Sequence, residues 1–371
     1  MSRRSTGSAD DLAAVAGAFA ADGVVIDVRP LGTGHVHDTF VMTLSVPDGG
    51  ASRLLLQRIN LRVFASPDAL MENLARVSEH LRAKIVEEGG DPLRGTLTIV
   101  PTRDGARLHR TDRGECYRAF RFIDGARSFD TARDATHAFE AARAFGRFVR
   151  LLGDLPAPRL DETIPGFADP AGRHAAFLRA VDADVANRVR RVTEELRFVE
   201  RHEALLHEAR VLFAPGALPE RVVHQDTKIN NVLMDDATGA GICVVDLDTT
   251  MPGRVLYDFG DLVRLGATRA AEDERDLARV LVDPDRLEAI AQGYLAETRG
   301  FLSRDEVAAL ALAGPIVALT IGLRFLADFL EGDSYFKVYR EDQNLDRCRV
   351  HLTLVRDLEQ RIPELRRALD R

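Results

Sequence analysis

Residues 222–233 read VVHQDTKINNVL, a polar stretch between two short apolar runs, and this segment decides the fold prediction. The runs Arg221–Val223 and Asn231–Met234 have the length and apolar content of short strands. The polar residues between them follow the pattern His-x-Asp-x-Lys-x-x-Asn. A further apolar run, Gly241–Val245, ends immediately before Asp246. The sequence therefore predicts a small β-structure with several polar side chains gathered at one end.

This combination of side chains suits phosphoryl transfer. The reaction needs a carboxylate at the attacking hydroxyl, oxygen ligands for Mg²⁺ and a cation near the moving phosphate. Asp226 is the candidate for the carboxylate, and Asn231 and Asp246 offer the hard oxygen atoms that Mg²⁺ prefers. Lys228, two residues beyond Asp226, is the candidate cation, and it is one of only three lysines in the chain. The alternative is an ordinary hairpin, because Asp and Asn are common in turns.

The segment resembles the catalytic loop of the aminoglycoside phosphotransferase / choline kinase-like superfamily, whose members are relatives of the protein kinases. Within that superfamily the chain is most similar to the N-acetylhexosamine 1-kinases. The matching blocks are Gly32-x-Gly34-His35, Leu56–Asn60, His224–Leu233, Val244–Thr249, Met251–Gly253, Leu256–Asp261 and Gly332–Phe336. The resemblance implies ATP and Mg²⁺ as cofactors and transfer of phosphate to the anomeric hydroxyl of a GlcNAc or GalNAc sugar.

The resemblance and the order of predicted elements indicate an α+β fold with two lobes, as in protein kinases. Residues 1–122 are expected to form a small β-rich nucleotide-binding lobe, and residues 123–371 a helical catalytic and substrate-binding lobe. We expect ATP to bind in the cleft between the lobes, with a hinge near Ile123–Gly125. The strands expected in the first lobe are Val24–Pro30, Thr39–Val46, Arg53–Ile59, Thr96–Val100 and Glu115–Ile123, and its helix is Pro67–Glu88. The helices expected in the second are Thr131–Leu152, Pro170–Arg191, Glu194–Leu212, Asp285–Thr298, Ser303–Leu330 with a break near Pro315, and Leu345–Leu369.

The nucleotide contacts are expected in three places along the first lobe. Gly32 and Gly34 would let the backbone of a flap approach phosphates, although a lone Gly-x-Gly is usually only a turn. Backbone groups of Phe122, Ile123 and Asp124 would hydrogen-bond the edge of a purine, the alternative being an ordinary strand end.

The chain has no lysine on the strand where protein kinases carry one that binds the α/β-phosphates, and the resembled sugar kinases also lack it. Arg58 is the predicted replacement, with Gln57 as the alternative. Glu72, on the following helix, could pair with Arg58 or be a solvated glutamate.

The resemblance also implies contacts to the sugar. His35, Arg324 and Tyr335 match the residues that hold the hexosamine beside the base, Asp226. Without the resemblance these three would be read as a flap residue, a solvated helix-end arginine and a core tyrosine. Leu265 departs from the phenylalanine expected in the family, which removes one candidate ring for stacking on the sugar.

Three further residues near the loop receive supporting roles. His224 is interpreted as a buried hydrogen-bonding residue that fixes the loop. The resemblance gives Asp258 the role of bracing the loop from the helical lobe. Asp248, predicted to share a strand face with Asp246, could support the metal.

Composition excludes several other classes. The formal net charge of −8 argues against a nucleic-acid-binding protein. Cys116, Cys243 and Cys348 lack a paired spacing and are interpreted as buried small hydrophobic residues. The uncharged run 307–323 is short for a membrane span and is predicted to be a buried helix pair, so a cytoplasmic protein is expected.

Two alternative functions remain open at this point. One is a kinase for another small hydroxyl acceptor, such as an aminoglycoside, an amino alcohol or a different sugar. The other is a nucleotide-binding pseudokinase, which is disfavoured because the base and both metal ligands are present. A serine hydrolase has no support, since the chain has no G-x-S-x-G motif. The oligomeric state and the sugar range are left unpredicted.

Overall fold

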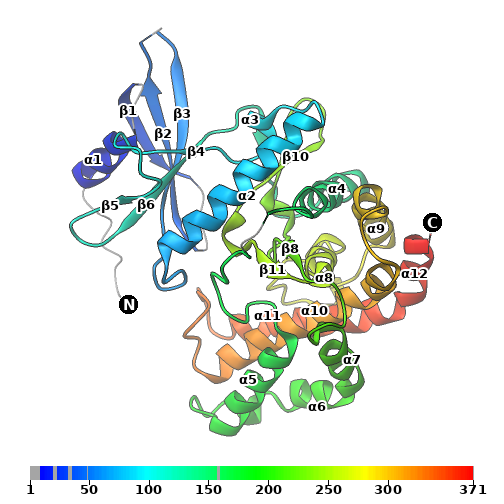
Figure 1. Cartoon of the computed structure of the whole chain (residues 1–371). Helices are drawn as coiled ribbons and strands as arrows, with labels where there is room; N and C mark the ends of the chain where they lie inside the picture. The colour runs from blue at the N-terminus through cyan, green and yellow to red at the C-terminus, as the bar shows by residue number, and fades with distance from the viewer. Residues whose placement is uncertain (1–8, 20–22, 32–35, 48, 157–158, 371) are drawn as a thin grey trace. The chain divides into compact units, whose positions relative to one another are not determined.

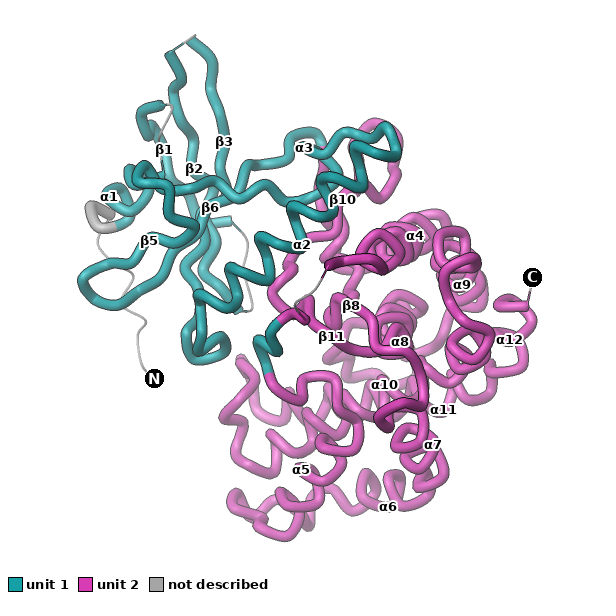
Figure 2. The backbone as a smooth tube through the Cα atoms, in the orientation of Figure 1, with its two compact units in different colours: residues 1–125, 161–164 teal, residues 126–160, 165–371 magenta. Residues whose placement is uncertain are grey.

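The computed structural model describes residues 9–19, 23–31, 36–47, 49–156 and 159–370. The chain divides into two compact units, which are coloured separately in Figure 2. Unit 1 comprises residues 1–125 and 161–164, and unit 2 comprises residues 126–160 and 165–371. Gly32, Gly34 and His35, which the sequence assigned to a flap and a sugar contact, lie outside the described residues.

The described part of unit 1 forms a six-stranded antiparallel sheet (Figure 1). Its main path has the order β1-β2-β3-β6-β4, and β5 pairs with β6 off this path. The strands are β1 (Val24–Pro30), β2 (Asp38–Ser45), β3 (Ala51–Arg58), β4 (Ile99–Val100), β5 (His109–Arg110) and β6 (Cys116–Arg121). Strand β4 is therefore shorter than the predicted run from Thr96.

Helices cover both faces of this sheet (Figure 1). Because side chains alternate along a strand, Leu54 and Leu56 share one face, and they are buried there with Phe19 of α1 (Ala9–Phe19). On the other face, Arg110 of β5 donates to Asp68 of α2 (Pro67–Glu87) at 2.6 Å. The short helix α3 (Pro92–Gly95) follows α2.

Unit 2 is mainly helical and also carries two small sheets (Figure 1). The sheets are β10-β9-β7 and β11-β8. Their strands are β7 (Ala126–Arg127), β8 (Arg221–Val223), β9 (Val232–Asp235), β10 (Gly241–Val244) and β11 (Met251–Gly253). The helices are α4 (Ala135–Leu151), α5 (Pro170–Ala183), α6 (Thr193–Arg201), α7 (Glu203–Phe213), α8 (Val255–Gly266), α9 (Pro284–Thr298), α10 (Arg304–Leu330), α11 (Gln343–Gln360) and α12 (Ile362–Asp370).

Helix α10 is continuous, so the predicted break near Pro315 and the predicted helix pair are wrong. Its start is fixed by a capping box in which Ser303 and Glu306 each accept the other's backbone N–H. Pro315 lies inside the helix, where its missing N–H costs one backbone hydrogen bond. Burial of most side chains of α10 in the core offsets that cost. Among the described helices only α10 is long and apolar enough to cross a membrane, and 83% of its most apolar window is buried within the protein.

Three other predicted helices are too long. Helix α5 ends at Ala183 because Asp184 has a φ of +37°, and its carboxylate accepts the backbone N–H of Arg188. The predicted helix 194–212 is divided at His202 into α6 and α7. The predicted C-terminal helix is divided at Arg361 into α11 and α12, because Pro363 has no N–H with which to continue the backbone hydrogen bonds of α11.

Two glycines let helices of unit 2 approach closely. A Cβ atom on Gly293 of α9 would lie 2.2 Å from the carbonyl oxygen of Phe139 in α4. A Cβ atom on Gly260 of α8 would lie 2.4 Å from the carbonyl oxygen of Ala313 in α10. The second contact places α8 tightly against α10. Helix α8 carries residues that support the predicted catalytic loop.

Candidate active site

The predicted catalytic loop runs from β8 to β9 and is braced by a buried carboxylate on α8. Asp258 accepts the backbone N–H groups of His224 and Gln225, each at 2.8 Å. Burial raises the pKa of Asp258 to about 6. Gln225 needs this support because its φ of +65° lies in the left-handed region. The predicted bracing role of Asp258 is confirmed.

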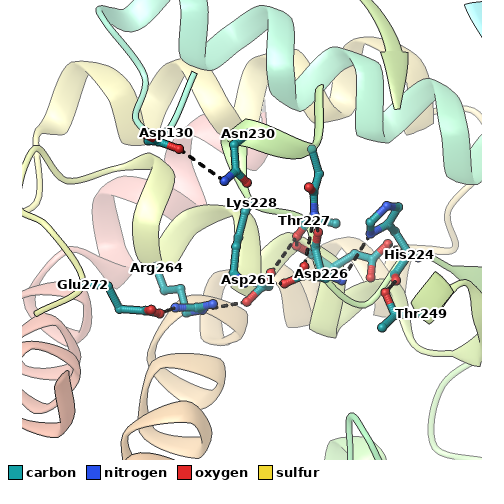
Figure 3. A network of polar contacts seen from close by, with 12 residues as sticks. Asp130, His224, Asp226, Thr227, Lys228, Asn230, Thr249, Asp261, Arg264 and Glu272 are labelled. Atoms are coloured by element: carbon teal, nitrogen blue, oxygen red, sulfur yellow. Dashed lines mark hydrogen bonds and ion pairs between the residues drawn. The ribbon is translucent and has the colours of Figure 1, made fainter. Parts of the chain in front are cut away.

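The His224 ring also fixes the loop, through hydrogen bonds at both ring nitrogens (Figure 3). The backbone N–H of Asp226 donates to His224 Nδ1 at 3.2 Å, so Nε2 carries the ring proton and donates to the Val245 carbonyl at 2.9 Å. The ring is fully buried and meets Phe145 and Phe148 edge-on. The predicted role of His224 as a buried hydrogen-bonding residue is confirmed.

Asp226 is held by two neighbours in an ionised form. Lys228 Nζ lies 3.0 Å from Asp226 Oδ1, and Asn231 Nδ2 donates to Asp226 Oδ2 at 3.1 Å. Burial alone would raise the pKa of Asp226, but the Lys228 ammonium holds that pKa below its usual range. The same contact raises the pKa of Lys228. The carboxylate is therefore unprotonated at neutral pH and can accept a proton from a hydroxyl group.

Strand pairing brings the two predicted metal ligands together. Val232 of β9 pairs with Val244 of β10, and the N–H of Val245 donates to the carbonyl of Asn231 at 2.9 Å. Asp246 follows at once, is exposed, and has a φ of +59° that ends the strand. The Asn231 amide nitrogen faces Asp226, and no residue in the described ranges hydrogen-bonds its Oδ1 atom.

Asp248 does not share a strand face with Asp246, so that expectation is wrong. Asp246 leaves the strand in a left-handed conformation, and Leu247–Thr249 form a 3₁₀ turn in which Asp248 is buried. Thr249 in the same turn donates from Oγ1 to the carbonyl of His224 at 2.7 Å. This turn therefore supports the catalytic loop.

A buried ionic network lies on α8 beside the loop (Figure 3). Arg264 is 3% exposed, and it donates to Asp261 at 2.6 Å and to Glu272 at 2.9 Å. Thr227 of the loop donates to the carbonyl of Asp258 at 2.6 Å and lies 3.5 Å from Asp261 Oδ2. Burial opposes ionisation of Glu272, but the charge of Arg264 dominates and lowers the pKa of that carboxyl to about 2. Sequence reasoning assigned no role to this network.

His351 completes the network as a neutral ring. Arg264 Nη1 can only donate, so His351 Nε2 accepts this bond at 2.9 Å, and Nδ1 donates to the Arg347 carbonyl at 2.8 Å. Burial, followed by the charge of Arg264, lowers the pKa of His351 to about 4. A proton on Nε2 would place two cations in contact.

Because the pKa of the buried His351 ring is low, we expect the protein to lose stability in mild acid. The folded pKa of the ring lies below the usual value of about 6.5, so the unfolded state gains a proton first as the pH falls. The contribution of the neutral ring to the free energy of unfolding is complete above pH 6.5 and falls as the pH is lowered to about 4. Between pH 7 and pH 5 the free energy of unfolding should fall by about 2 kcal/mol for this reason. Urea unfolding of wild type and His351→Gln at both pH values measures this term. The variant should lose about 2 kcal/mol less than wild type on acidification, and an equal loss in the two proteins would contradict the assignment.

Arg324 lies among aromatic rings on α10. Its guanidinium carbon is 5.2 Å from the ring centre of Phe167, 6.0 Å from that of Tyr335 and 5.5 Å from that of Phe336. The loop with Tyr335 and Phe336 is anchored by Asp328, whose carboxylate accepts the N–H groups of Tyr335 at 2.7 Å and Phe336 at 3.0 Å. Arg324 and Tyr335, two of the three predicted sugar contacts, are therefore brought together, and Tyr335 is 60% exposed.

Arg58 lies on the face of the unit 1 sheet that packs against α1. It is opposite Tyr117 in the register, pairs with Asp38, and donates to Glu115 at 2.7 Å. Glu72 does not pair with Arg58, because it accepts a hydrogen bond from Arg107 at 2.8 Å.

Gln57, the alternative to Arg58, lies on the opposite face, which is the one covered by α2. There its Oε1 atom accepts from Arg118 Nε at 3.0 Å and from Nη2 at 2.9 Å. Arg118 is 1% exposed and was not singled out in the sequence.

Two of the backbone groups predicted to bind a purine already have partners within unit 1. The N–H of Phe122 donates to the carbonyl of Arg53 at 3.1 Å, and the carbonyl of Asp124 accepts from Arg94 Nη1 at 2.5 Å. The Asp124 carboxylate pairs with Arg53. For the backbone of Ile123, the described residues supply no hydrogen-bond partner, so Ile123 is the best remaining donor and acceptor of the three.

The described residues contain no group of three or more His, Cys, Asp or Glu side chains that could hold a metal ion. Asn231 and Asp246 alone would suffice where substrate phosphates and water complete the coordination of Mg²⁺. The three cysteines are buried and unpaired by disulfides, as predicted.

Comparison with known proteins agrees with this geometry. The sequence pattern of the phosphotransferase enzyme family known as APH matches residues 27–300, most of the chain. The chain belongs to this family. The match confirms the predicted α+β, protein kinase-like fold and the assignment to phosphotransferases.

Solved structures of several kinases share the fold at low sequence identity. The microcompartment-associated aminopropanol kinase is 16% identical with a TM-score of 0.54, covering 96% of this chain and 99% of that one. An amicoumacin kinase in complex with AMP-PNP, Ca²⁺ and amicoumacin is 12% identical, with a TM-score of 0.58 and coverages of 96% and 93%. A choline/ethanolamine kinase family protein from Mesorhizobium loti is 17% identical, with a TM-score of 0.53 and 97% coverage of both chains. At these identities the likeness shows the fold alone.

Proposed function

We propose that the protein is an ATP- and Mg²⁺-dependent kinase that phosphorylates the anomeric hydroxyl of an N-acetylhexosamine. The products would be ADP and the sugar 1-phosphate. The observation that carries the kinase assignment is the contact of Asp226 with Lys228 and Asn231, in a loop braced by Asp258. The sugar assignment rests on the sequence blocks shared with N-acetylhexosamine 1-kinases.

The chemistry then follows from the positions of a few side chains. Asp226 orients the sugar hydroxyl and accepts its proton as the hydroxyl oxygen bonds to the γ-phosphorus. The bond from that phosphorus to the β–γ bridging oxygen breaks, and ADP leaves. Lys228, in contact with Asp226, offsets charge on the transferred phosphate. A bound Mg²⁺ would neutralise phosphate charge, and Asn231 Oδ1 with the Asp246 carboxylate would hold it.

Nucleotide contacts are proposed on residues 1–122 and the segment that follows them. Ile123 is the proposed contact to the purine edge, with Phe122 and Asp124 as its neighbours. Gly32 and Gly34 remain the proposed phosphate flap. Arg58 is the weaker of the proposed phosphate cations, since two carboxylates already engage it.

The acceptor end of the site favours a sugar over an amine. Arg324 presents a positive charge among the rings of Phe167, Tyr335 and Phe336. A cationic acceptor would meet repulsion from this charge, whereas the aromatic cages that bind quaternary amines contain no cation of their own. Arg324, Tyr335 and His35 are therefore proposed as the contacts to the sugar hydroxyl and acetamido groups. The named substrates of the aminopropanol and choline/ethanolamine kinases, by contrast, are amines.

A panel of acceptors tests the proposal directly. ADP release would be followed with Mg²⁺–ATP and separate GlcNAc, GalNAc, glucose, kanamycin, choline and ethanolamine. We expect turnover of at least one N-acetylhexosamine and none of the three amines, because Arg324 repels a cation. Turnover of only choline, ethanolamine or kanamycin would retain the kinase chemistry and overturn the sugar assignment. ATP binding without turnover of any acceptor would favour a pseudokinase.

A further inference from the structure

A second arginine lies beside Arg324, at the same phenylalanine. Arg173 of α5 donates from Nη2 to the backbone carbonyl of Phe167 at 3.3 Å. Arg324 of α10 holds its guanidinium carbon 5.2 Å from the centre of the Phe167 ring. Two guanidinium groups from different helices therefore converge on one residue.

Neither guanidinium has an acidic partner. Within the ranges that the structure describes, no carboxylate lies within ion-pair distance of Arg173 or Arg324. The Nε atom of Arg173 is buried and has no hydrogen-bond acceptor. Burial, followed by the charge of Arg324, lowers the pKa of Arg173, whereas Tyr257, Tyr335 and Asp169 act in the opposite direction. A buried N–H without an acceptor is costly, and the Nε atoms of Arg254 and Arg286 share this feature, but in the described ranges neither of those arginines shares an aromatic residue with a second arginine.

Three other arginines of unit 2 with little exposed surface show the contrast. Arg221 donates to both oxygens of Glu306, Arg188 pairs with Asp333 at 2.6 Å, and Arg264 has two carboxylates. In these cases a carboxylate compensates the charge. The Arg173–Arg324 pair lacks that compensation, so a purely structural role leaves its charge unexplained.

The arginine pair acts electrostatically on α8, the helix that carries the network beside the loop. Tyr257 stands one helical turn before Asp261 on α8, so the two side chains share a face of that helix. The charges of Arg324, Asp261, Arg264 and Arg173 all act on the Tyr257 phenol, which burial keeps neutral by raising its pKa to about 12. Tyr257 is therefore within electrostatic range of both the network beside Asp226 and the arginine pair.

We propose that Arg173 and Arg324 form a binding site for an anionic group on the acceptor, so that the preferred sugar carries a carboxylate or a phosphate. This inference rests on the proposed function, because it concerns the acceptor side of the same site. A planar guanidinium binds carboxylate and phosphate oxygens through two parallel hydrogen bonds. The ring of Phe167 and the exposed Tyr335 would flank the sugar itself.

Matched pairs of acceptors test the site. Kinetics would compare GlcNAc with N-acetylglucosaminuronic acid, glucose with glucuronic acid, and glucose with glucose 6-phosphate. The neutral and anionic acceptors of each pair differ at a single carbon. The ratio of their kcat/KM values therefore measures the effect of the negative charge. We expect the ratio to favour at least one acid by roughly tenfold or more, since hydrogen bonds to charged groups contribute about 1.5–3 kcal/mol. The glucuronic acid and 6-phosphate arms distinguish a carboxylate from a phosphate.

Variants link the preference to the pair. Arg173→Gln should reduce the ratio to about one, and Arg173→Lys should retain part of it because the charge remains. Arg179→Gln is the matched control, since Arg179 is an exposed arginine on the same helix, and it should leave the ratio unchanged. Calorimetric binding of glucose and glucuronic acid to wild type and Arg173→Lys gives the same comparison without turnover, and it serves if Arg173→Gln folds poorly.

The outcomes separate this inference from the proposed function. Turnover of GlcNAc with no gain for any acid, in rate or in binding, overturns the anion site and leaves the sugar kinase intact. A preference for an acid that survives in Arg173→Gln also overturns it. Turnover of amines alone overturns both the anion site and the sugar kinase assignment. An acid preference that Arg173→Gln removes supports the site, even if neutral sugars react slowly.

Discussion

Replacing Asp226 by Asn is expected to lower kcat by roughly 10²–10⁴-fold, the contribution typical of a general base. The amide cannot take the proton of the attacking hydroxyl, although it keeps the size of the carboxylate. Asn231 and Asp246 are untouched, so the dissociation constant for ATP should change little. Single-turnover kinetics with the best acceptor and calorimetric binding of Mg²⁺–ATP measure the two quantities on the same protein.

The matched control is Asp305→Asn, which makes the same change at an exposed aspartate in the first turn of α10. It should retain wild-type kcat and wild-type stability. Retention of more than a tenth of the wild-type kcat in Asp226→Asn would contradict the assignment of Asp226 as the base. Loss of ATP binding together with turnover would instead indicate that the substitution disturbs the loop.

Replacing Arg264 by Met is expected to lower the free energy of unfolding by about 3–5 kcal/mol, the cost of removing one partner from a buried ionic network. The Arg264 side chain is 3% exposed, and its removal leaves Asp261 and Glu272 facing each other with His351 as a neutral neighbour. Equilibrium unfolding in urea at pH 7 measures the change.

Arg279→Met serves as the control for this experiment. Arg279 is 71% exposed and pairs with Glu274 at 3.4 Å, a surface contact that contributes at most about 1 kcal/mol. A loss below 1 kcal/mol in Arg264→Met would show that the network does not hold α8 beside the catalytic loop. An additional fall in activity under fully folded conditions would indicate that the network also positions Thr227 and Lys228.

The polar loop between β8 and β9 could be predicted from sequence because its signals are local. Asp226, Lys228 and Asn231 lie within a few residues of one another, and short apolar runs mark the strands on either side. Sequence similarity added the roles that spacing alone left open. The brace from Asp258 followed from that similarity, whereas the buried position of His224 was inferred without it.

Helix α8 was not predicted, although its polar residues Asp258, Asp261 and Arg264 recur at the three-residue spacing of a helix. Nearly every residue from Val255 to Gly266 is buried, so the helix lacks the exposed polar face that marks an ordinary surface helix. The contacts of Arg264 with Glu272 and His351 join segments that are distant in the sequence. No local sequence pattern indicates such contacts. The network around Arg264 could therefore be recognised only in the folded structure.

The position of Arg58 shows that a sequence motif does not tell which face of a sheet a side chain lies on. Arg58 and Gln57 are adjacent in sequence and therefore lie on opposite faces of β3. Which face packs against α1 is decided by Leu54 and Leu56, and these place Arg58 on that side. Arg173, by contrast, had no sequence signal, because α5 carries two arginines, Arg173 and Arg179, and nothing in the sequence tells the half-buried one from the exposed one.

The most direct test of the central claim is the identity of the phosphorylated atom. The product of GlcNAc or the preferred related sugar with Mg²⁺–ATP would be examined by ³¹P NMR with proton coupling. The account predicts a phosphate monoester coupled to the anomeric proton, formed by wild type and absent with Asp226→Asn. A phosphate on any other oxygen, or an undiminished signal from the variant, would contradict it.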